Sequence, residues 1–154
     1  MAGNTREALI AQYRAGPQVL ADAIGKVPPD RLDVTQQKGE WTPREIVHHV
    51  ADSETTSYIR LRRLLAEERP VIQGYDEMAF ARKLHYDRPI ENSLAVVRAV
   101  RNASAELLAT LSEEEWQREG VHSESGRYTL LNWLQIYAAH CHDHAEQIRK
   151  ASGI

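Results

Sequence analysis

Apolar residues recur at every third or fourth position along most of the chain, which is the spacing of one face of an α-helix. Strict alternation of apolar and polar residues, which is typical of strands, is nearly absent. Four amphipathic helices joined by polar connections are typical of a four-helix bundle, so the expected fold class is all-α. The pattern predicts four long helices, over Thr5–Ile24, Thr42–Glu67, Glu91–Leu111 and Thr129–Lys150.

Local signals mark where these helices begin and where they are disturbed. Thr42 suits the N-cap of the second helix, Pro43 suits its first turn, and Glu45 completes a capping box. In the first helix, the ring of Pro17 removes a backbone hydrogen bond, which predicts a kink or a break at Gly16-Pro17.

The connections between the helices are expected to hold short extra helices. The segment from Pro70 to Pro89 is long for a bundle, and long connections in compact domains are often functional or act as lids. A short helix is predicted there around Met78–Leu84, and a second one over Ser112–Trp116. The stretch Ser123–Gly126 has the composition of a turn.

Length and composition narrow the function classes. With 154 residues, the chain is expected to form a single domain over residues 1–154. A net charge of −3, with basic and acidic residues interspersed, argues against a nucleic-acid partner. The sequence shows neither a signal peptide nor a long apolar run, and its one cysteine cannot form an internal disulfide. We therefore expect a cytoplasmic protein without a membrane partner.

The histidines are the main chemical signal, and the fourth helix carries three of the seven. At about 100° per residue, His140 and His144 point toward the bundle interior, whereas His142 should face water. Two histidines one helical turn apart on one face are a natural pair of metal ligands. The alternative is two core histidines, each satisfied by a hydrogen bond.

The second helix carries the adjacent pair His48 and His49. Neighbours on a helix diverge by about 100°, so one metal ion is not expected to bind both. His49 lies beside Ile46, along a boundary that could line a cavity. His48 lies with Asp52 on the side expected to face solvent. The pattern favours His49 as a ligand, by a small margin, and predicts that His48 is a surface residue.

The stretch from Trp41 to Glu54, WTPREIVHHVADSE, resembles the second-helix motif of the DinB-like superfamily, and most of all its YfiT branch. The resemblance covers nearly the whole chain and is specific in combination. It implies an up-and-down-type four-helix bundle with a three-histidine metal site. Further matching segments are Tyr58-Ile59-Arg60, Tyr75-Asp76-Glu77, the turn Ser123–Gly126, Tyr137-Ala138-Ala139-His140, and His144 followed by Gln147-Ile148.

The resemblance and the helical pattern predict the same three metal ligands, His49, His140 and His144. Neutral imidazoles suit zinc or nickel, which we expect, with iron or manganese as alternatives. Three protein ligands leave a position open for water or substrate, which is the pattern of a catalytic site. Members of the family often have two adjacent histidines where this chain has Asp143-His144, so we expect Asp143 to lie outside the ligand set. No catalytic residue beyond the ligands and no organic cofactor is predicted.

The family is described as metal-dependent hydrolases and bacillithiol S-transferases, and a homodimer is a further implication of the resemblance. The first hypothesis is a thiol S-transferase that joins a bacillithiol-like small thiol to an electrophile. The second is a hydrolase that uses a metal-activated water. The third is a metal-binding stress protein without enzyme activity.

For each remaining candidate residue, the sequence either leaves two roles open or favours a purely structural role. Cys141 is expected to be a buried structural thiol. Arg60 either holds an anionic group of the substrate or forms a surface ion pair. Five residues of the connections complete the set: Tyr75, Asp76 and Glu77, at the pocket mouth or in a simple turn, and His85 and His122, expected to be exposed.

Overall fold

The structure, a computed structural model, describes residues 5–154 and contains the expected bundle. The third long helix ends at Leu108, three residues before its predicted end at Leu111, because Ala109–Leu111 form a turn. The four long helices are α1 (Arg6–Gly25), α2 (Pro43–Ala66), α4 (Glu91–Leu108) and α5 (Leu130–Ser152).

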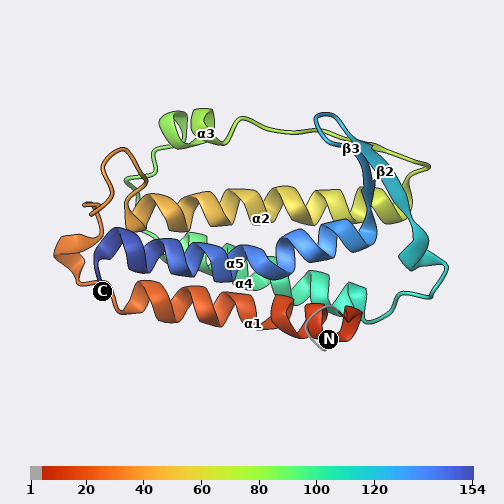
Figure 1. Cartoon of the computed structure of the whole chain (residues 1–154), viewed down its shortest axis with the longest axis horizontal. Helices are drawn as coiled ribbons and strands as arrows, with labels where there is room; N and C mark the ends of the chain where they lie inside the picture. Colours follow the sequence, from red (N-terminus) through yellow and green to blue (C-terminus); the bar gives the residue numbers. More distant parts are fainter. Residues whose placement is uncertain (1–4) are drawn as a thin grey trace.

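The order of the helices around the bundle differs from a simple up-and-down arrangement. Helix α1 packs against α4 and α5, and α2 packs against the same two helices, so α1 and α2 are diagonal partners. Figure 1 shows α1 and α5 running in one direction and α2 and α4 in the other. The expected up-and-down topology is therefore wrong. The cause is the segment 67–90, which crosses the length of the bundle and returns the chain to the end where α2 began.

This crossover segment is tied to the bundle by a small sheet that the sequence pattern did not predict. Its strands are β1 (Val71–Ile72), β2 (Glu119–His122) and β3 (Gly126–Thr129). The strand order is β1-β2-β3, with β1 parallel to β2 and β2 antiparallel to β3. The predicted turn at Ser123–Gly126 connects β2 to β3. Strands of two and four residues are too short to show alternation. The other short elements are the 3-10 helices η2 (Pro29–Arg31) and η3 (Glu115–Gln117) and helix α3 (Glu77–Lys83).

Caps and apolar faces form as the sequence indicates. Thr42 and Glu45 make the predicted capping box, and Thr129 makes a second one with Asn132 at the start of α5. The faces of the four long helices that point inward form a core with Trp133 and Leu134 fully buried at its centre. Among residues 5–154, no helix is long and apolar enough to cross a membrane.

Helix α1 continues through Pro17, so the break allowed for at Gly16-Pro17 does not occur. Proline has no N–H to donate to the carbonyl of Tyr13, four residues earlier. Arg101 of α4 supplies the missing donor, with its Nη1 atom 2.7 Å from the Tyr13 oxygen. Gly16 makes room for it, because a Cβ atom there would lie 2.8 Å from Arg101 Nη1 and 2.9 Å from Cys141 Cβ.

Candidate metal centre

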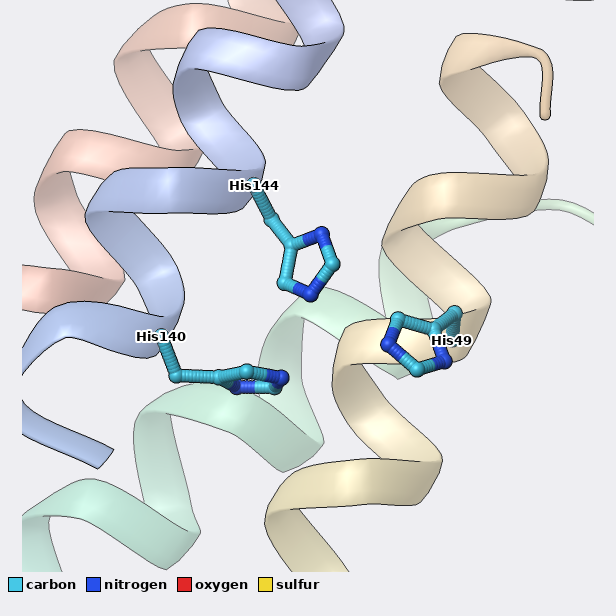
Figure 2. Close-up of side chains that lie close together, drawn as sticks. All are labelled: His49, His140 and His144. Carbon is cyan, nitrogen blue, oxygen red and sulfur yellow. The ribbon is translucent and has the colours of Figure 1, made fainter. Parts of the chain in front are cut away.

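The structure brings the three predicted ligand residues together (Figure 2). His49 extends from α2, while His140 and His144 extend from α5, one turn apart. One ring nitrogen of each residue lies within 4.8 Å of the other two. The ring centroids of His140 and His144 are 4.6 Å apart, and those of His49 and His144 are 4.7 Å apart. The fold thus converts two separate helical signals into one cluster.

The donor set of this cluster fits a divalent metal ion. In a tetrahedral zinc site with Zn–N bonds of about 2.0–2.1 Å, ligand nitrogens lie about 3.3–3.4 Å apart, so small side-chain rotations are sufficient. Burial, with the neighbouring histidines, lowers the pKa of His49 to about 3. Burial and His140 likewise lower the pKa of His144 to about 4. Both rings are therefore neutral at pH 7, which is the form that binds a metal ion.

Two of the three rings have a partner that fixes their orientation. The Nδ1–H group of His144 donates a hydrogen bond to Oε1 of Gln147, with 2.7 Å between the nitrogen and the oxygen. The Nδ1 atom of His140 lies 3.4 Å from Oε2 of Glu54, and both atoms are buried without a hydrogen bond of good geometry to any described residue. In metal sites such partners hold the imidazole so that its other nitrogen faces the ion. Gln147 and Glu54 therefore orient the rings of His144 and His140 so that their Nε2 atoms are free to bind an ion.

Glu54 is itself held by a buried ion pair with Arg101, whose Nε atom donates to Glu54 Oε1. The side chains of Glu54 and Arg101 are 0% and 1% exposed. The two other guanidinium nitrogens donate to the carbonyls of Tyr13 and Tyr137, at 2.7 Å each. Burial alone would raise the pKa of Glu54, but His140 and Arg101 together lower it, so the carboxylate stays ionised. One network thus joins all four long helices to the ring of His140.

Sequence analysis missed Glu54 and Arg101, although a signal for both exists. Glu54 follows Val50 by four residues and precedes Leu61 by seven, so it lies on the apolar face of α2. Arg101 lies on the inward face of α4, four residues after Val97. Two opposite charges on buried faces of different helices indicate an internal ion pair.

The prediction for His48 is wrong, because this residue is fully buried. Its Nε2 atom donates to the carbonyl of Arg88 at 2.8 Å, and its Nδ1 atom accepts from the Ser93 hydroxyl at 2.7 Å. The end of the crossover segment and the start of α4 cover this side of α2. His142 is also less exposed than predicted, because its Nε2 atom donates to the carbonyl of Gln12 on the adjacent α1.

Most other candidates have structural roles. Cys141 is buried as predicted, and burial raises the pKa of its thiol to about 12. Asp143 is exposed and lies outside the histidine cluster. His85 is exposed, whereas His122 is half-buried and accepts a hydrogen bond from the backbone of the β2–β3 turn. Asp76 caps α3.

Arg60 does not form the surface ion pair that was one of its two interpretations. Among the described residues, no carboxylate oxygen lies within 4.0 Å of its guanidinium nitrogens. Its Nη1 atom donates to the Tyr137 hydroxyl at 3.3 Å, and its Nη2 atom donates to the carbonyl of Gln73 at 3.0 Å. The guanidinium therefore lies under the crossover segment, next to α5.

The buried histidines predict a loss of stability of the metal-free protein as the pH falls below about 6.5. His49 and His144 stay neutral in the folded state down to about pH 3 and 4, but they bind protons near pH 6.5 when unfolded. Between pH 6.5 and 4 the unfolded state therefore binds more protons, and each group removes up to about 1.4 kcal/mol of stability per pH unit. Urea denaturation over this range measures the slope, which His49→Gln should reduce. A free energy of unfolding that stays constant from pH 7 to pH 5 contradicts the expectation.

Comparison with known proteins gives matches along most of the chain. The DinB superfamily matches residues 12–148. A protein of Oceanobacillus iheyensis, provisionally named a metal-dependent hydrolase, is 36% identical over 132 residues, which are 86% of this chain and 77% of that protein. YfiT of Bacillus subtilis, named in the same provisional way, is 35% identical over 138 residues, or 88% of this chain and 78% of YfiT.

Solved structures share the fold. The structure of Bacillus subtilis YfiT, described as a four-helix bundle of unusual topology, matches 95% of this chain and 86% of its own, with a TM-score of 0.88 and 32% identity. A mycothiol-dependent maleylpyruvate isomerase matches 92% of this chain and 60% of its own, with a TM-score of 0.70. At 15% identity, the second likeness concerns the fold alone.

Proposed function

The chain belongs to the DinB superfamily, and on this premise we propose that it is a metal-dependent enzyme whose ion is bound by His49, His140 and His144. The observation that carries the proposal is the convergence of three imidazoles, two of them with depressed pKa values, on one point between α2 and α5. Three protein ligands leave room for a substrate atom, which distinguishes such a site from a closed structural one. Zinc or nickel suits this donor set best.

We propose thiol transfer as the reaction. A divalent cation held by these residues would supply Lewis-acid chemistry that lowers the pKa of a thiol substrate toward neutrality. Glu54 and Gln147 keep the rings of His140 and His144 oriented throughout. The sulfur of a bacillithiol-like small thiol forms a bond to an electrophilic carbon of the second substrate. The leaving group departs with the bonding electron pair, and the thiol proton passes to solvent.

The carboxylates around the cluster favour a thiol over water as the nucleophile. A general base that assists a metal-activated water must lie within hydrogen-bond reach of the water proton. Glu54 is tied to Arg101, and Asp52 accepts a hydrogen bond from the Tyr86 hydroxyl at 2.6 Å. In the described part of the chain, no carboxylate or thiol joins the three histidines. A small thiol needs no such base, because an ordinary thiol already has a pKa of about 8.5.

Hydrolysis is the second candidate, and the names of the relatives favour it. The proteins from Oceanobacillus iheyensis and Bacillus subtilis are both provisionally named metal-dependent hydrolases. In this reaction a water molecule takes the place of the thiol, and its proton passes to solvent rather than to a protein base. Ester and amide substrates offered without any thiol separate the two candidates.

The proposal predicts enzyme-dependent conjugation of a thiol to monobromobimane, in which a C–S bond forms and bromide leaves. Bacillithiol, mycothiol, glutathione and coenzyme A are offered one at a time, and fluorescence measures the product. At least one thiol should give a rate that a chelator abolishes and that zinc or nickel restores. The rate should persist below the pKa of the free thiol, which is about 8.5 for an ordinary cysteine.

Two variants control this assay. His144→Ala should lose the conjugation activity, and His142→Ala should keep it, because His142 bonds to α1 rather than to the cluster. Hydrolysis of an ester or amide that needs no thiol and that a chelator abolishes would contradict the transferase and support the hydrolase. Absence of both activities in a protein that retains its metal would support a binding protein without enzyme activity.

A further inference from the structure

A second polar cluster borders the three histidines. It consists of Arg60 on α2, Tyr137 on α5, Tyr128 on β3 and Tyr75 in the crossover segment. Arg60 Nη1 donates to the Tyr137 hydroxyl at 3.3 Å. The ring of Tyr137 lies edge-on to the ring of His140, with 5.6 Å between the centroids. The positive end of Arg60 therefore lies beside the candidate metal centre.

Arg60 brings a positive charge that the protein does not neutralise locally. Its Nη1 and Nη2 atoms donate to two uncharged oxygens, those of Tyr137 and Gln73. Its Nε atom is buried and has no hydrogen-bond partner among residues 5–154. A buried charged donor without a partner destabilises the folded state unless a ligand satisfies it. The guanidinium is thus prepared for an anion.

The surrounding tyrosines add uncharged hydrogen-bond donors next to the guanidinium. The hydroxyls of Tyr128 and Tyr75 are buried and lie near Arg60 and Ser53, respectively, but neither makes a hydrogen bond of good geometry to the described residues. Tyr128 is 4% exposed. Burial raises the pKa of Tyr128 although Arg60 opposes the change, and burial raises the pKa of Tyr75 to about 12. Both phenols therefore keep their protons and can donate to the oxygens of one carboxylate.

Helix geometry directs Arg60 toward the metal centre. Arg60 follows His49 by eleven residues, which is about 16 Å along the axis of α2. Long side chains on a helix point back toward its N-terminus, so the guanidinium points toward His49. Ser53 lies between them, and the Tyr75 hydroxyl lies beside Ser53. Tyr137 touches both sites, with its hydroxyl 3.3 Å from Arg60 Nη1 and its ring centroid 5.6 Å from that of His140. The distance from an anion at Arg60 to a reacting atom at the histidines is therefore about the length of one tyrosine side chain.

We infer that Arg60, Tyr128 and Tyr75 form a subsite for the carboxylate of a substrate whose reacting end lies at His49, His140 and His144. The inference rests on the proposed function and names the substrate class for it: a small thiol or a small electrophile that carries a carboxylate. Two matched pairs of probes distinguish these sources. They are 3-mercaptopropionate against 2-mercaptoethanol, and iodoacetate against iodoacetamide.

Binding of the thiol pair is measured on cobalt-loaded protein, through the sulfur-to-cobalt charge-transfer absorption. The electrophile pair is measured by the KM for alkylation of 2-mercaptoethanol. In one of the two arms the wild type should prefer the carboxylate probe. Arg60→Gln should weaken binding of that probe about tenfold or more, seen as a higher dissociation constant for the thiol or a higher KM for the electrophile. This is the loss expected when a charged hydrogen-bonding partner is removed. Affinity for the neutral probe should stay unchanged.

Two further variants separate recognition from structure. Arg63→Gln is the matched control, because Arg63 also bonds a carbonyl of the crossover segment, that of Val71 at 2.8 Å, but has Glu67 as an ion partner. It should leave both probe pairs unchanged. Tyr128→Phe removes a hydroxyl that faces Arg60 without a hydrogen bond of good geometry, so the variant should fold normally and weaken binding of the carboxylate probe only.

The outcomes distinguish failure of the subsite from failure of the proposed function. No preference for a carboxylate in either arm, or equal loss of charged and neutral probes in Arg60→Gln, overturns the subsite. Selective loss of 3-mercaptopropionate binding in a protein that conjugates no thiol supports the subsite and refutes the transferase. A protein that takes up no cobalt overturns both.

Discussion

Replacing Arg101 by methionine is expected to lower the free energy of unfolding by about 3–5 kcal/mol, the loss typical of a broken buried ion pair. The variant leaves the carboxylate of Glu54 without its cation in a position that is 0% exposed. It also leaves the Tyr13 carbonyl without a donor, because Pro17 cannot supply one. Urea denaturation of the metal-free proteins at pH 7.5 measures the difference.

A double variant separates the contribution of the two buried charges to stability from that of the hydrogen bonds that Arg101 donates to backbone carbonyls. Glu54→Gln combined with Arg101→Met removes both charges, and replacing a whole buried pair is often close to neutral. It should recover much of the loss, and the part that remains reports on the carbonyls of Tyr13 and Tyr137. A single Arg101→Met variant within about 1 kcal/mol of the wild type would show that the network does not stabilise the bundle.

The second large effect concerns the metal itself. Alanine at His49, His140 or His144 is expected to reduce the metal content from about one ion per chain to almost none, because two ligands rarely hold a divalent ion against dilution. Elemental analysis after gel filtration measures the content. Glu54→Gln keeps all three ligands, but it changes the partner of His140 and also breaks the buried ion pair with Arg101. In protein that is still folded at the assay temperature, it should weaken metal binding about 10–100-fold rather than abolish it.

Two histidines outside the cluster provide the controls for this experiment. His142→Ala should keep its metal, because His142 bonds to Gln12 on α1. His48→Asn should also keep its metal but lose stability, since the buried ring bridges Ser93 and the Arg88 carbonyl. Full metal content in His49→Ala together with metal loss in His48→Asn would reverse the assignment on α2.

Local signals were sufficient to predict the long helices and the inward pair His140 and His144, whereas the choice of His49 depended mainly on the resemblance to the DinB-like superfamily. The capping box at Thr42 fixed the start of α2, and the spacing of His140 and His144 placed both rings on one face of α5. Tertiary structure decided the rest. The burial of His48 depends on residues about 40 positions away, and the pairing of Glu54 with Arg101 depends on which helices are neighbours. The direction of α4 depends on a crossover that helical periodicity does not encode.

The crossover segment also has a consequence for the order of folding. Its strand β1 pairs with β2 in parallel, so that Val71 meets Val121 across fifty positions of the chain. To form this pairing, the chain must first lose the entropy of closing a long loop, and only then do the stabilising contacts form. The helices, in contrast, are stabilised by contacts between residues close in sequence. We expect the segment to close late, and to open by itself in native-state hydrogen exchange while the helical amides stay protected. Because Gln73 and Tyr75 belong to it, ligand exchange at Arg60 can then proceed without unfolding of the bundle.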